Sequence, residues 1–422
     1  MTSEGVACVV GLGYVGLPLA VALVEAGQPV VGYDVDQRRV CALNEGRSGI
    51  EDVSDATLAA ALSDGFSVTS GLSDTRSATT YVICVPTPLR DGMPDLTAVE
   101  GAARAVAEVL GAGDLVILES TTYPGTTEEV LAPLLEAGSG LRVGVDFLLA
   151  YSPERIDPGN VAYGITNTPK VVGGINEGAT KAAKAFYEQV VEEVVTVAGP
   201  REAEMAKLLE NTFRHVNIAL VNEMAVFCRQ LDIDLWDVIG AAKTKPFGFM
   251  PFYPGPGVGG HCIPVDPSYL SWRVKKLGFS FRFVELAQEI NAQMPSFTVT
   301  RLADLLNDAG LALSRSRVLC LGAAYKPGIS DCRESPAIEV MHKLRQKGAT
   351  VLYSDAFVPE LVLDTELLHS QQLTSQLLAS VDAVVVLTPH PDLDLDLVSA
   401  HATLVLDTRA AITQPAPSVH RL

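Results

Sequence analysis

The chain has 422 residues, enough for two or three domains, and 48% of them are hydrophobic, so large buried cores are possible. Its 31 Lys and Arg stand against 50 Asp and Glu, giving a net charge of −19, and no basic cluster indicates a nucleic-acid-binding protein. This composition favours a soluble acidic enzyme that holds an anionic substrate with a few placed cations.

The first apolar segment, residues 5–24, has no charged residue and is about long enough to span a bilayer. No Lys or Arg precedes it, so it lacks the basic start of a signal peptide, and no other segment could form a second span. Its glycines divide it into a predicted buried strand at 6–10 and a buried helix that ends near Ala26. We therefore expect a cytoplasmic protein without a membrane partner.

The chain then alternates short apolar runs with helical patterns. Five such segments follow in order: strands at 30–33, 81–85 and 115–118, and helices at 58–62 and 96–110. The alternation continues to about Val197 and is typical of a doubly wound parallel sheet. We assign residues 1–199 to this first α/β domain.

The middle of the chain is helical. Residues 202–231 contain neither Pro nor Gly and predict one long helix, which suits a domain connector or the core of an oligomer. Helical patterns recur over 236–242 and 286–306, on either side of an irregular Pro- and Gly-rich segment at 246–267. We expect residues 200–313 to form a helical dimerisation domain, and the chain to be a homodimer or higher homo-oligomer.

From Arg317 the alternation begins again and predicts a second α/β domain over residues 314–422. Its predicted strands lie at 318–321, 351–353, 383–387 and 404–406, and its first helix at 336–347. Ser335 is the expected N-cap of that helix, with Pro336 at its first position.

A glycine-rich turn follows the first predicted strand and opens the first helix. Its sequence is Gly11-Leu12-Gly13-Tyr14-Val15-Gly16, and Asp34 closes the second strand. Gly11 permits the tight turn, Gly13 admits a pyrophosphate, and Gly16 lets the helix pack on the strand. Asp34 would accept hydrogen bonds from the ribose hydroxyls and repel the 2′-phosphate of NADP. The pattern therefore predicts a Rossmann-like domain that binds NAD. The expected fold is thus two Rossmann-like doubly wound domains joined by a long central helix.

Two alternatives stay open at this site. A glycine-rich turn can occur without any ligand, although the strand, the helix and the acidic residue all favour the dinucleotide. Arg39 lies one helical turn beyond the end of the second strand, where it could stack on the adenine or be a solvated helix residue.

The seven cysteines are scattered, without a CxxC pair or a spacing suited to zinc, so we expect no metal site. Cys8, Cys84 and Cys320 lie in apolar runs, where buried thiols are expected. Cys262 instead follows a loop rich in Gly and Pro, and Asp266 comes four residues later. This setting favours a nucleophile over a structural cysteine in a turn.

Nearly the whole chain resembles the UDP-sugar 6-dehydrogenases of the UDP-glucose/UDP-mannuronate dehydrogenase superfamily. Seven motifs carry the resemblance in order: residues 11–16, Cys84-Val-Pro-Thr-Pro88, Glu119-Ser-Thr-Thr-Tyr-Pro-Gly125, Tyr151-Ser-Pro-Glu-Arg-Ile156, Lys207-Leu-Leu-Glu-Asn211, residues 257–266, and Ala324-Tyr-Lys-Pro327 with Asp331-Cys-Arg-Glu-Ser-Pro336.

The resemblance implies a four-electron oxidation of a sugar C6 alcohol to a carboxylate, through a thiohemiacetal and a thioester on Cys262. It implies that Lys207 and Asn211 stabilise the oxyanion, that Thr121 and Asp266 hold the water, and that Glu154 serves thioester hydrolysis. It implies NAD contacts from residues 11–16, Asp34, Arg39, Thr87, Ser120 and Arg333. It implies sugar-nucleotide contacts from Glu154, Arg155, Lys207, Asn211, Arg214, Tyr253, Gly259, Lys326 and Arg409.

Two features depart from the UDP-glucose enzymes. Pro158 stands where those enzymes have a second acidic residue, and the cysteine loop contains His261. Both are similar to the branch that acts on UDP-N-acetylhexosamines, so we expect UDP-N-acetylglucosamine or a relative, and a role in polysaccharide biosynthesis. UDP-glucose or TDP-glucose is the alternative substrate. A two-electron hydroxyacid-type dehydrogenase and a non-catalytic nucleotide-sugar-binding protein are the alternatives of other classes.

Overall fold

The computed structural model describes residues 5–156, 160, 162–260, 263–414 and 416–422. The chain divides into two compact units, one made of residues 1–210 with 268–279 and the other of residues 211–267 with 280–422.

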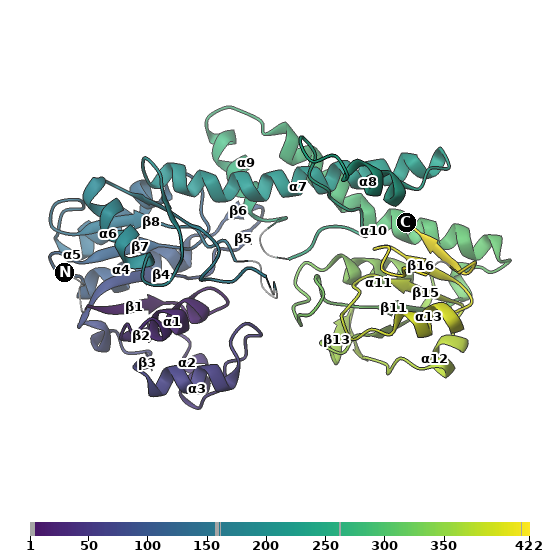
Figure 1. Ribbon diagram of the computed structural model, residues 1–422, viewed down its shortest axis with the longest axis horizontal. Helices are drawn as coiled ribbons and strands as arrows, with labels where there is room; N and C mark the ends of the chain where they lie inside the picture. Colours follow the sequence, from purple (N-terminus) through teal and green to yellow (C-terminus); the bar gives the residue numbers. More distant parts are fainter. Residues whose placement is uncertain (1–4, 157–159, 161, 261–262, 415) are drawn as a thin grey trace. The chain divides into compact units, whose positions relative to one another are not determined.

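The first unit is built on a twisted sheet with the strand order β10-β9-β8-β7-β4-β1-β2-β3 (Figure 1). These strands are β1 (Val6–Val10), β2 (Val30–Tyr33), β3 (Phe66–Thr69), β4 (Ala78–Ile83), β7 (Leu115–Leu118), β8 (Leu148–Tyr151), β9 (Lys170–Gly174) and β10 (Val194–Thr196). Neighbouring strands are parallel except β8 and β9, which pair antiparallel. The predicted doubly wound sheet is therefore present, with its last two strands reversed in direction.

Helices cover both faces of this sheet. They are α1 (Gly16–Glu25), α2 (Gln37–Asn44), α3 (Asp55–Ser63), α4 (Thr97–Val109), α5 (Ala132–Ser139) and α6 (Glu177–Tyr187). Ala7 and Val9 pack into a core with α1, α3 and α6, whereas Cys8 and Val10 pack into a second core with α4 and α5. Because both faces are buried, the strands are apolar throughout, which is the pattern that predicted them.

Four strands of the second α/β region differ from their predicted bounds by one residue, and one strand of the first unit differs by more. The strand expected over 81–85 is β4, which ends at Ile83. Gly11 comes so close to Cys84, the residue after β4, that a Cβ on Gly11 would lie 2.8 Å from the Cys84 carbonyl oxygen. Cys84 and Val85 therefore belong to the loop at the end of the sheet. A short hairpin follows, made of β5 (Leu89–Arg90) and β6 (Met93–Pro94).

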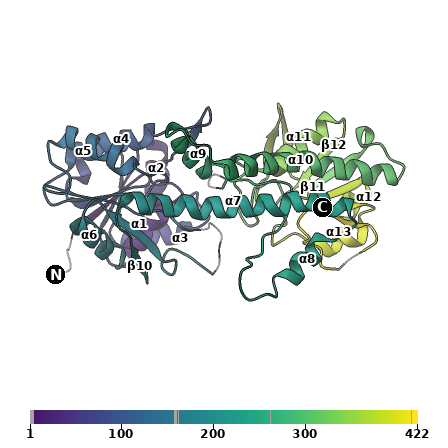
Figure 2. The ribbon, with the colours of Figure 1, turned by 90° about the horizontal axis from the view of Figure 1, so that it is seen from above.

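The long helix predicted over 202–231 is α7 (Pro200–Gln230), an uninterrupted helix of 31 residues (Figure 2). The other helices of this region are α8 (Leu235–Ala242), α9 (Asp266–Lys276) and α10 (Arg282–Asp308). The sequence pattern missed α9, which begins where the Pro- and Gly-rich segment ends. No helix in the described part of the chain is both long and apolar enough to cross a membrane.

The second unit carries a parallel sheet with the order β12-β11-β15-β16-β17. Its strands are β11 (Arg317–Leu321), β12 (Thr350–Ser354), β15 (Ala383–Val386), β16 (Val405–Asp407) and β17 (Val419–Arg421), with a hairpin of β13 (Glu360–Leu363) and β14 (Glu366–His369). Helix α11 (Pro336–Gln346) packs with α10 on one face, and α12 (Ser375–Ala379) and α13 (Leu395–His401) cover the other. Ser335 caps α11 as predicted, since its hydroxyl accepts the Ala337 N–H.

In each sheet the strand order reverses beside the first strand, between β1 and β4 in the first unit and between β11 and β15 in the second. Open α/β sheets bind ligands in the crevice at the carboxyl ends of the strands where this reversal occurs. The loops that follow these strands are therefore the places to look for a site in each unit.

Candidate active site

The glycine turn after β1 has the shape that a dinucleotide requires. Gly11 has a φ of +93°, and a Cβ on Gly16 would lie 1.9 Å from the Gly11 carbonyl oxygen, so both positions demand glycine. At Gly13 a Cβ would meet no atom within 4 Å, which leaves open space at the N-terminus of α1. Open space in front of a helix N-terminus suits a pyrophosphate.

Asp34 lies directly after β2, beside this turn. Its Oδ2 accepts the Leu12 N–H at 2.9 Å, and its Oδ1 accepts the Asp36 N–H at 2.9 Å. A carboxylate oxygen has two lone pairs, so the half-buried side chain can still accept ribose hydroxyls. The residues present therefore fit NAD.

The arginine that the sequence left ambiguous braces the same turn. Arg39 Nε donates to the Leu12 carbonyl at 3.0 Å, and its Nη1 donates to the Ser48 carbonyl. Burial lowers the pKa of this guanidinium, although Asp34 opposes the shift. Arg39 is thus neither solvated nor directed only at a ligand. Tyr14 in the turn is 42% exposed.

The loops after β4 and β7 are tied together by hydrogen bonds. Thr87 Oγ1 donates to the Thr121 carbonyl at 2.8 Å, and Ser120 Oγ donates to the Val85 carbonyl at 2.7 Å. Tyr151 donates to the Ser120 carbonyl at 3.3 Å. Thr87, Ser120 and Thr121 therefore gather at the carboxyl ends of the strands on one side of the reversal point.

Lys207 and Glu154 meet in the first unit. Lys207 Nζ donates to the Glu154 carbonyl oxygen at 2.6 Å and lies 3.5 Å from its carboxylate Oε2. The two side chains are only 7% and 13% exposed. Arg155, next in the chain, donates to Glu210 at 2.7 Å and to the Pro169 carbonyl at 2.6 Å. Lys207 is not a surface lysine, and Glu154 is not a free loop carboxylate.

A buried polar cluster beside these loops was not foreseen. Glu119, the first residue after β7, pairs with Lys170 and accepts the Tyr187 hydroxyl at 2.8 Å. Burial raises the pKa of Tyr187 and, assisted by Glu119, that of Cys84. A charged residue at a strand end was a usable signal for Glu119. The partners are 51 and 68 residues away in sequence, so no local pattern could indicate them.

In the second unit, Asn211 of α7 reaches Asp266, the first residue of α9. Asn211 Nδ2 donates to Asp266 Oδ2 at 2.5 Å, and Asp266 is 4% exposed. These two residues, both expected to serve the oxidation, are thus in direct contact.

The loop before the proposed nucleophile packs closely against the last domain. A Cβ on Gly259 would lie 2.7 Å from the Glu334 carbonyl oxygen, and one on Gly260 would lie 2.7 Å from the Tyr325 ring. The glycines therefore permit a close approach of two chain segments. Pro158, His261 and Cys262 themselves lie outside the described residues.

The candidate cations of the second unit occupy different settings. Arg333 is half-exposed and makes two hydrogen bonds to Asp331, at 2.8 and 2.7 Å. Arg409 donates from Nε to the Leu387 carbonyl at 3.2 Å, and burial lowers its pKa to about 10. Lys326 is half-buried in the loop after β11, whereas Arg214 is exposed on α7.

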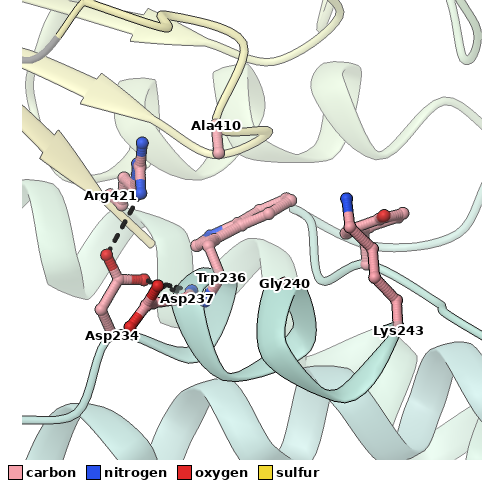
Figure 3. A pocket seen from close by; sticks show the side chains of 8 residues that line it. Asp234, Trp236, Asp237, Gly240, Lys243, Ala410 and Arg421 are labelled. Atoms are coloured by element: carbon pink, nitrogen blue, oxygen red, sulfur yellow. Dashed lines mark hydrogen bonds and ion pairs between the residues drawn. The ribbon is translucent and has the colours of Figure 1, made fainter. Parts of the chain in front are cut away.

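Tyr253 lines a pocket of about 480 Å³ in the second unit. Figure 3 labels Trp236 and Arg421 among the other lining residues. The Tyr253 ring stacks on Trp236 with a centroid separation of 5.6 Å and an interplanar angle of 13°. At another side of the pocket Arg421 pairs with Asp234 at 3.1 Å. The remaining lining residues are Asp237, Gly240, Lys243 and Ala410.

The open glycine turn, the acidic residue at the next strand end and the buried lysine–glutamate pair define an NAD-dependent dehydrogenase. Three family models match the chain: the NAD-binding domain of the UDP-glucose/GDP-mannose dehydrogenase family over residues 6–191, its central domain over 201–293, and its UDP-binding domain over 319–414. The chain belongs to the UDP-glucose/GDP-mannose dehydrogenase family.

Relatives with assigned names cover most of the chain. UDP-N-acetyl-D-mannosamine dehydrogenase from Pyrococcus horikoshii is 38% identical over 91% of this chain and 89% of its own length. UDP-N-acetyl-D-glucosamine 6-dehydrogenase from Pseudomonas aeruginosa is 37% identical over 83% of this chain and 82% of its own length. A solved structure of the Pyrococcus horikoshii UDP-D-ManNAc dehydrogenase superposes with a TM-score of 0.88 at 35% identity, covering 99% of this chain and 98% of that one.

Proposed function

We propose that the protein oxidises the C6 alcohol of a UDP-N-acetylhexosamine to the carboxylate, with Cys262 as covalent nucleophile. The observation that carries the proposal is the pair of Lys207 and Glu154, which is nearly buried in the unit that contains the open NAD turn. A lysine and a carboxylate in such a setting suit the stabilisation of an oxyanion and the transfer of a proton.

The residues of the glycine turn would hold NAD, and two NAD molecules bound in succession would each supply the acceptor for one of the two hydrides. Gly13 leaves room for a pyrophosphate, and the half-buried Asp34 would accept hydrogen bonds from the adenosine ribose. By resemblance, Thr87 and Ser120 line the same crevice and Arg333 contacts the pyrophosphate. These side chains would bind and orient NAD and take no part in the redox chemistry.

The chemistry at C6 falls to the side chains of this chain. The Cys262 thiolate adds to the aldehyde carbonyl, and after the second oxidation the sulfur remains bonded to the acyl carbon as a thioester. Lys207 and Asn211 stabilise negative charge on the sugar oxygen. Glu154 takes a proton from the water that breaks the carbon–sulfur bond, and Thr121 and Asp266 hold that water.

The sugar identity is supported by two arguments. The relatives described above are named for UDP-N-acetylmannosamine and UDP-N-acetylglucosamine. Pro158 and His261 depart from the pattern of the UDP-glucose enzymes in the same direction. By resemblance, Arg155, Arg214, Tyr253, Gly259, Lys326 and Arg409 contact the sugar nucleotide.

An NADH-release screen tests this proposal. UDP-N-acetylglucosamine, UDP-N-acetylgalactosamine, UDP-N-acetylmannosamine, UDP-glucose and TDP-glucose would each be incubated with NAD and the protein. We expect two NADH per sugar acid, with an N-acetylhexosamine as the fastest substrate. Preference for UDP-glucose or TDP-glucose would correct the sugar. One NADH and a stable ketone would favour a two-electron enzyme, and binding without NADH would favour a non-catalytic protein.

Cys262→Ala separates the mechanisms further. The variant should form no sugar acid while binding UDP and NAD as the wild type does, because the thiol is needed only for the covalent steps. Cys332→Ala is the matched control, since that half-buried thiol lies in the second unit and has no proposed role. Full turnover by Cys262→Ala would contradict the covalent route.

We also propose that the protein is a cytoplasmic homodimer or higher homo-oligomer. Met205, Leu209, Phe213, Leu220 and Phe227 form an apolar stripe along α7, and each is between 40% and 61% exposed. A contiguous apolar stripe on a surface helix suits contact with a second copy. The six described cysteines are all free thiols, which fits a reducing compartment.

Sedimentation at micromolar protein tests the dimer. Leu220→Glu should shift the wild-type dimer towards monomer, because it places a charge inside the stripe. Val362→Glu is the control, since Val362 is similarly exposed at 64% but lies on β13. A monomeric wild-type protein would overturn the proposal, and fractionation of cells would test the compartment.

A further inference from the structure

The loop after β12 in the second unit repeats a feature of the dinucleotide turn. In the first unit Gly11 follows β1, and Asp34 at the end of β2 accepts the next backbone N–H. In the second unit Gly322 follows β11, and Asp355 at the end of β12 accepts the next two, Ala323 N–H at 2.7 Å and Ala324 N–H at 3.2 Å. The two aspartates therefore have equivalent places in equivalent sheets.

Their surroundings differ. Asp34 is half-buried, whereas the Asp355 side chain is 0% exposed. Asp355 Oδ1 accepts the N–H groups of Phe357 and Val358, at 2.8 and 3.1 Å. Burial alone would raise the pKa of Asp355, but hydrogen bonds from His390 and the backbone outweigh it and hold that pKa below its usual range.

His390 hydrogen-bonds to Oδ2 of Asp355, whose counterpart in the first unit, Asp34, is the residue expected to bind the NAD ribose. Its Nε2 lies 3.0 Å from Asp355 Oδ2, and its Nδ1 accepts the Gly328 N–H at 3.2 Å. Because Nδ1 accepts, the proton of the neutral ring is on Nε2 and points at Asp355. Phe357 stacks on the imidazole ring of His390 with a centroid separation of 4.7 Å, and the His390 side chain is 4% exposed.

We propose that His390 is a positioning residue that takes the place of a nucleotide ribose on Asp355 and fixes the loop carrying Lys326. Gly328, which it binds, lies two residues from Lys326. Thr388, on the same segment after β15, fixes the loop at a second point, since its hydroxyl donates to the Ala324 carbonyl at 2.7 Å. The crevice is thereby closed to a dinucleotide ribose and holds Lys326 in place for a nucleoside diphosphate.

This inference rests on the proposed function, because it assigns Lys326 to the diphosphate of the sugar nucleotide. A direct measure that does not depend on that function is amide hydrogen exchange at Gly328. His390→Ala should speed exchange at Gly328 by at least about tenfold, since its acceptor is removed. The same variant should raise the Kd for UDP by about tenfold or more and leave the Kd for NAD within about twofold.

Imidazole provides the rescue. Added imidazole should enter the cavity left by His390→Ala, restore slow exchange at Gly328 and recover most of the UDP affinity. His369→Ala is the matched control, because that histidine is 62% exposed on β14 and pairs only loosely with Glu360 at 3.3 Å. It should show no change and no response to imidazole.

If His390→Ala does not fold, two more conservative variants still test the inference. His390→Asn keeps an acceptor near Nδ1 and should retain UDP affinity within about threefold while losing stability. His390→Gln keeps a donor for Asp355 and should lose UDP affinity while retaining more stability. If the variants lose UDP and NAD affinity equally, or if His390→Ala binds UDP normally, the positioning role is wrong. If wild type binds no UDP but His390→Ala still exposes Gly328, the proposed function fails and the loop contact stands.

Discussion

Gly11 and Gly322 occupy the same place in the two α/β domains, each directly after the first strand of its sheet. Both have positive φ, +93° and +86°, and both lie against a carbonyl oxygen of the strand loop across the reversal point. After Gly11 the chain enters α1 almost at once and leaves open space at Gly13. After Gly322 the chain instead makes a long loop, residues 323–335, before α11 begins.

The difference shows how one backbone plan serves two kinds of ligand. The first domain leaves open space at Gly13 before the helix and Asp34 partly exposed, which suits a dinucleotide. In the second domain His390 hydrogen-bonds to the equivalent aspartate, Asp355, and the longer loop carries Lys326. The same strand order therefore gives a dinucleotide crevice in one case and a fixed loop in the other.

The largest expected effect comes from adding a methyl group at Gly322, and a smaller one from the same change at Gly11. Gly322→Ala would place a Cβ 2.1 Å from the Thr388 carbonyl oxygen, so we expect a loss of about 3–5 kcal/mol in unfolding free energy. Gly11→Ala, with 2.8 Å to the Cys84 oxygen, should cost about 1–3 kcal/mol and abolish NAD binding. Urea unfolding measures both.

The two tryptophans report on the units separately. Trp272 belongs to the first unit and Trp236 to the second, so replacing either with Phe leaves one fluorescent reporter. Gly322→Ala should shift the Trp236 transition and Gly11→Ala the Trp272 transition. Equal shifts of both reporters by either variant would contradict the equivalence drawn between the turns.

Asp355→Asn and Asp34→Asn should separate stability from ligand binding. Asp355→Asn places an amide donor among backbone N–H groups that need an acceptor and should cost about 2–4 kcal/mol. Asp34→Asn should cost under about 1 kcal/mol but raise the KM for NAD by about tenfold. Chemical unfolding and steady-state kinetics measure the two effects, and a reversed order would show that Asp34 is the structural residue.

The pH dependence of stability should have opposite signs in the two units. In the first, Glu204 of α7 accepts the N–H groups of Gly125 and Thr127, at 2.5 and 2.9 Å. Burial raises the pKa of Glu204 from 4.5 to about 7 against these bonds. A raised pKa means that the folded state binds the proton more tightly, so this contribution to stability is complete below pH 4.5 and is lost as the pH rises through about 7. The pKa of Asp355 is lowered from 3.8. Its contribution to stability is therefore complete above pH 3.8 and is lost as the pH falls through the lower pKa of the folded state.

Glu204→Gln isolates the first of these terms. Wild type should lose about 1–3 kcal/mol from this group between pH 4.5 and 7, and the variant should lose that much less. Urea titrations at several pH values, followed by Trp272, measure the difference. Glu202→Gln, an exposed glutamate on the same helix, should leave the wild-type slope unchanged. An identical slope in Glu204→Gln would show that the carboxyl is ionised throughout.

The smallest effect on stability is expected at Gly13. Gly13→Ala meets no neighbouring atom, so the unfolding free energy should change by less than about 0.5 kcal/mol. The added methyl group would stand where the pyrophosphate approaches, and the KM for NAD should rise by about tenfold. Gly101→Ala on the exposed face of α4 is the control and should leave NAD binding unchanged. A normal KM for Gly13→Ala would contradict the position of the dinucleotide.

Much of the fold was predictable because buried parallel strands are apolar throughout and caps and glycines mark their ends. The strands at 6–10 and 30–33, the long helix α7 and the cap at Ser335 were all predicted from such local signals. Helix α9 was missed because it follows an irregular segment, and the antiparallel pairing of β8 with β9 has no local signature. The glycine turn and its acidic partner were readable because their spacing is fixed by one strand–helix–strand unit.

By itself, the sequence determined that this is an NAD-dependent nucleotide-sugar dehydrogenase with two α/β domains, since motifs of fixed spacing survive in the linear order of residues. Only the tertiary structure decided that Lys207 is buried against Glu154, that Glu119 pairs with Lys170, and that Asp355 is bonded to His390. Those contacts join residues 35 to 53 positions apart. Asp355 and His390 meet because parallel strands bring their carboxyl ends to one edge of a sheet, whereas Lys170 reaches that edge at the start of the antiparallel strand β9 and Lys207 reaches Glu154 from α7.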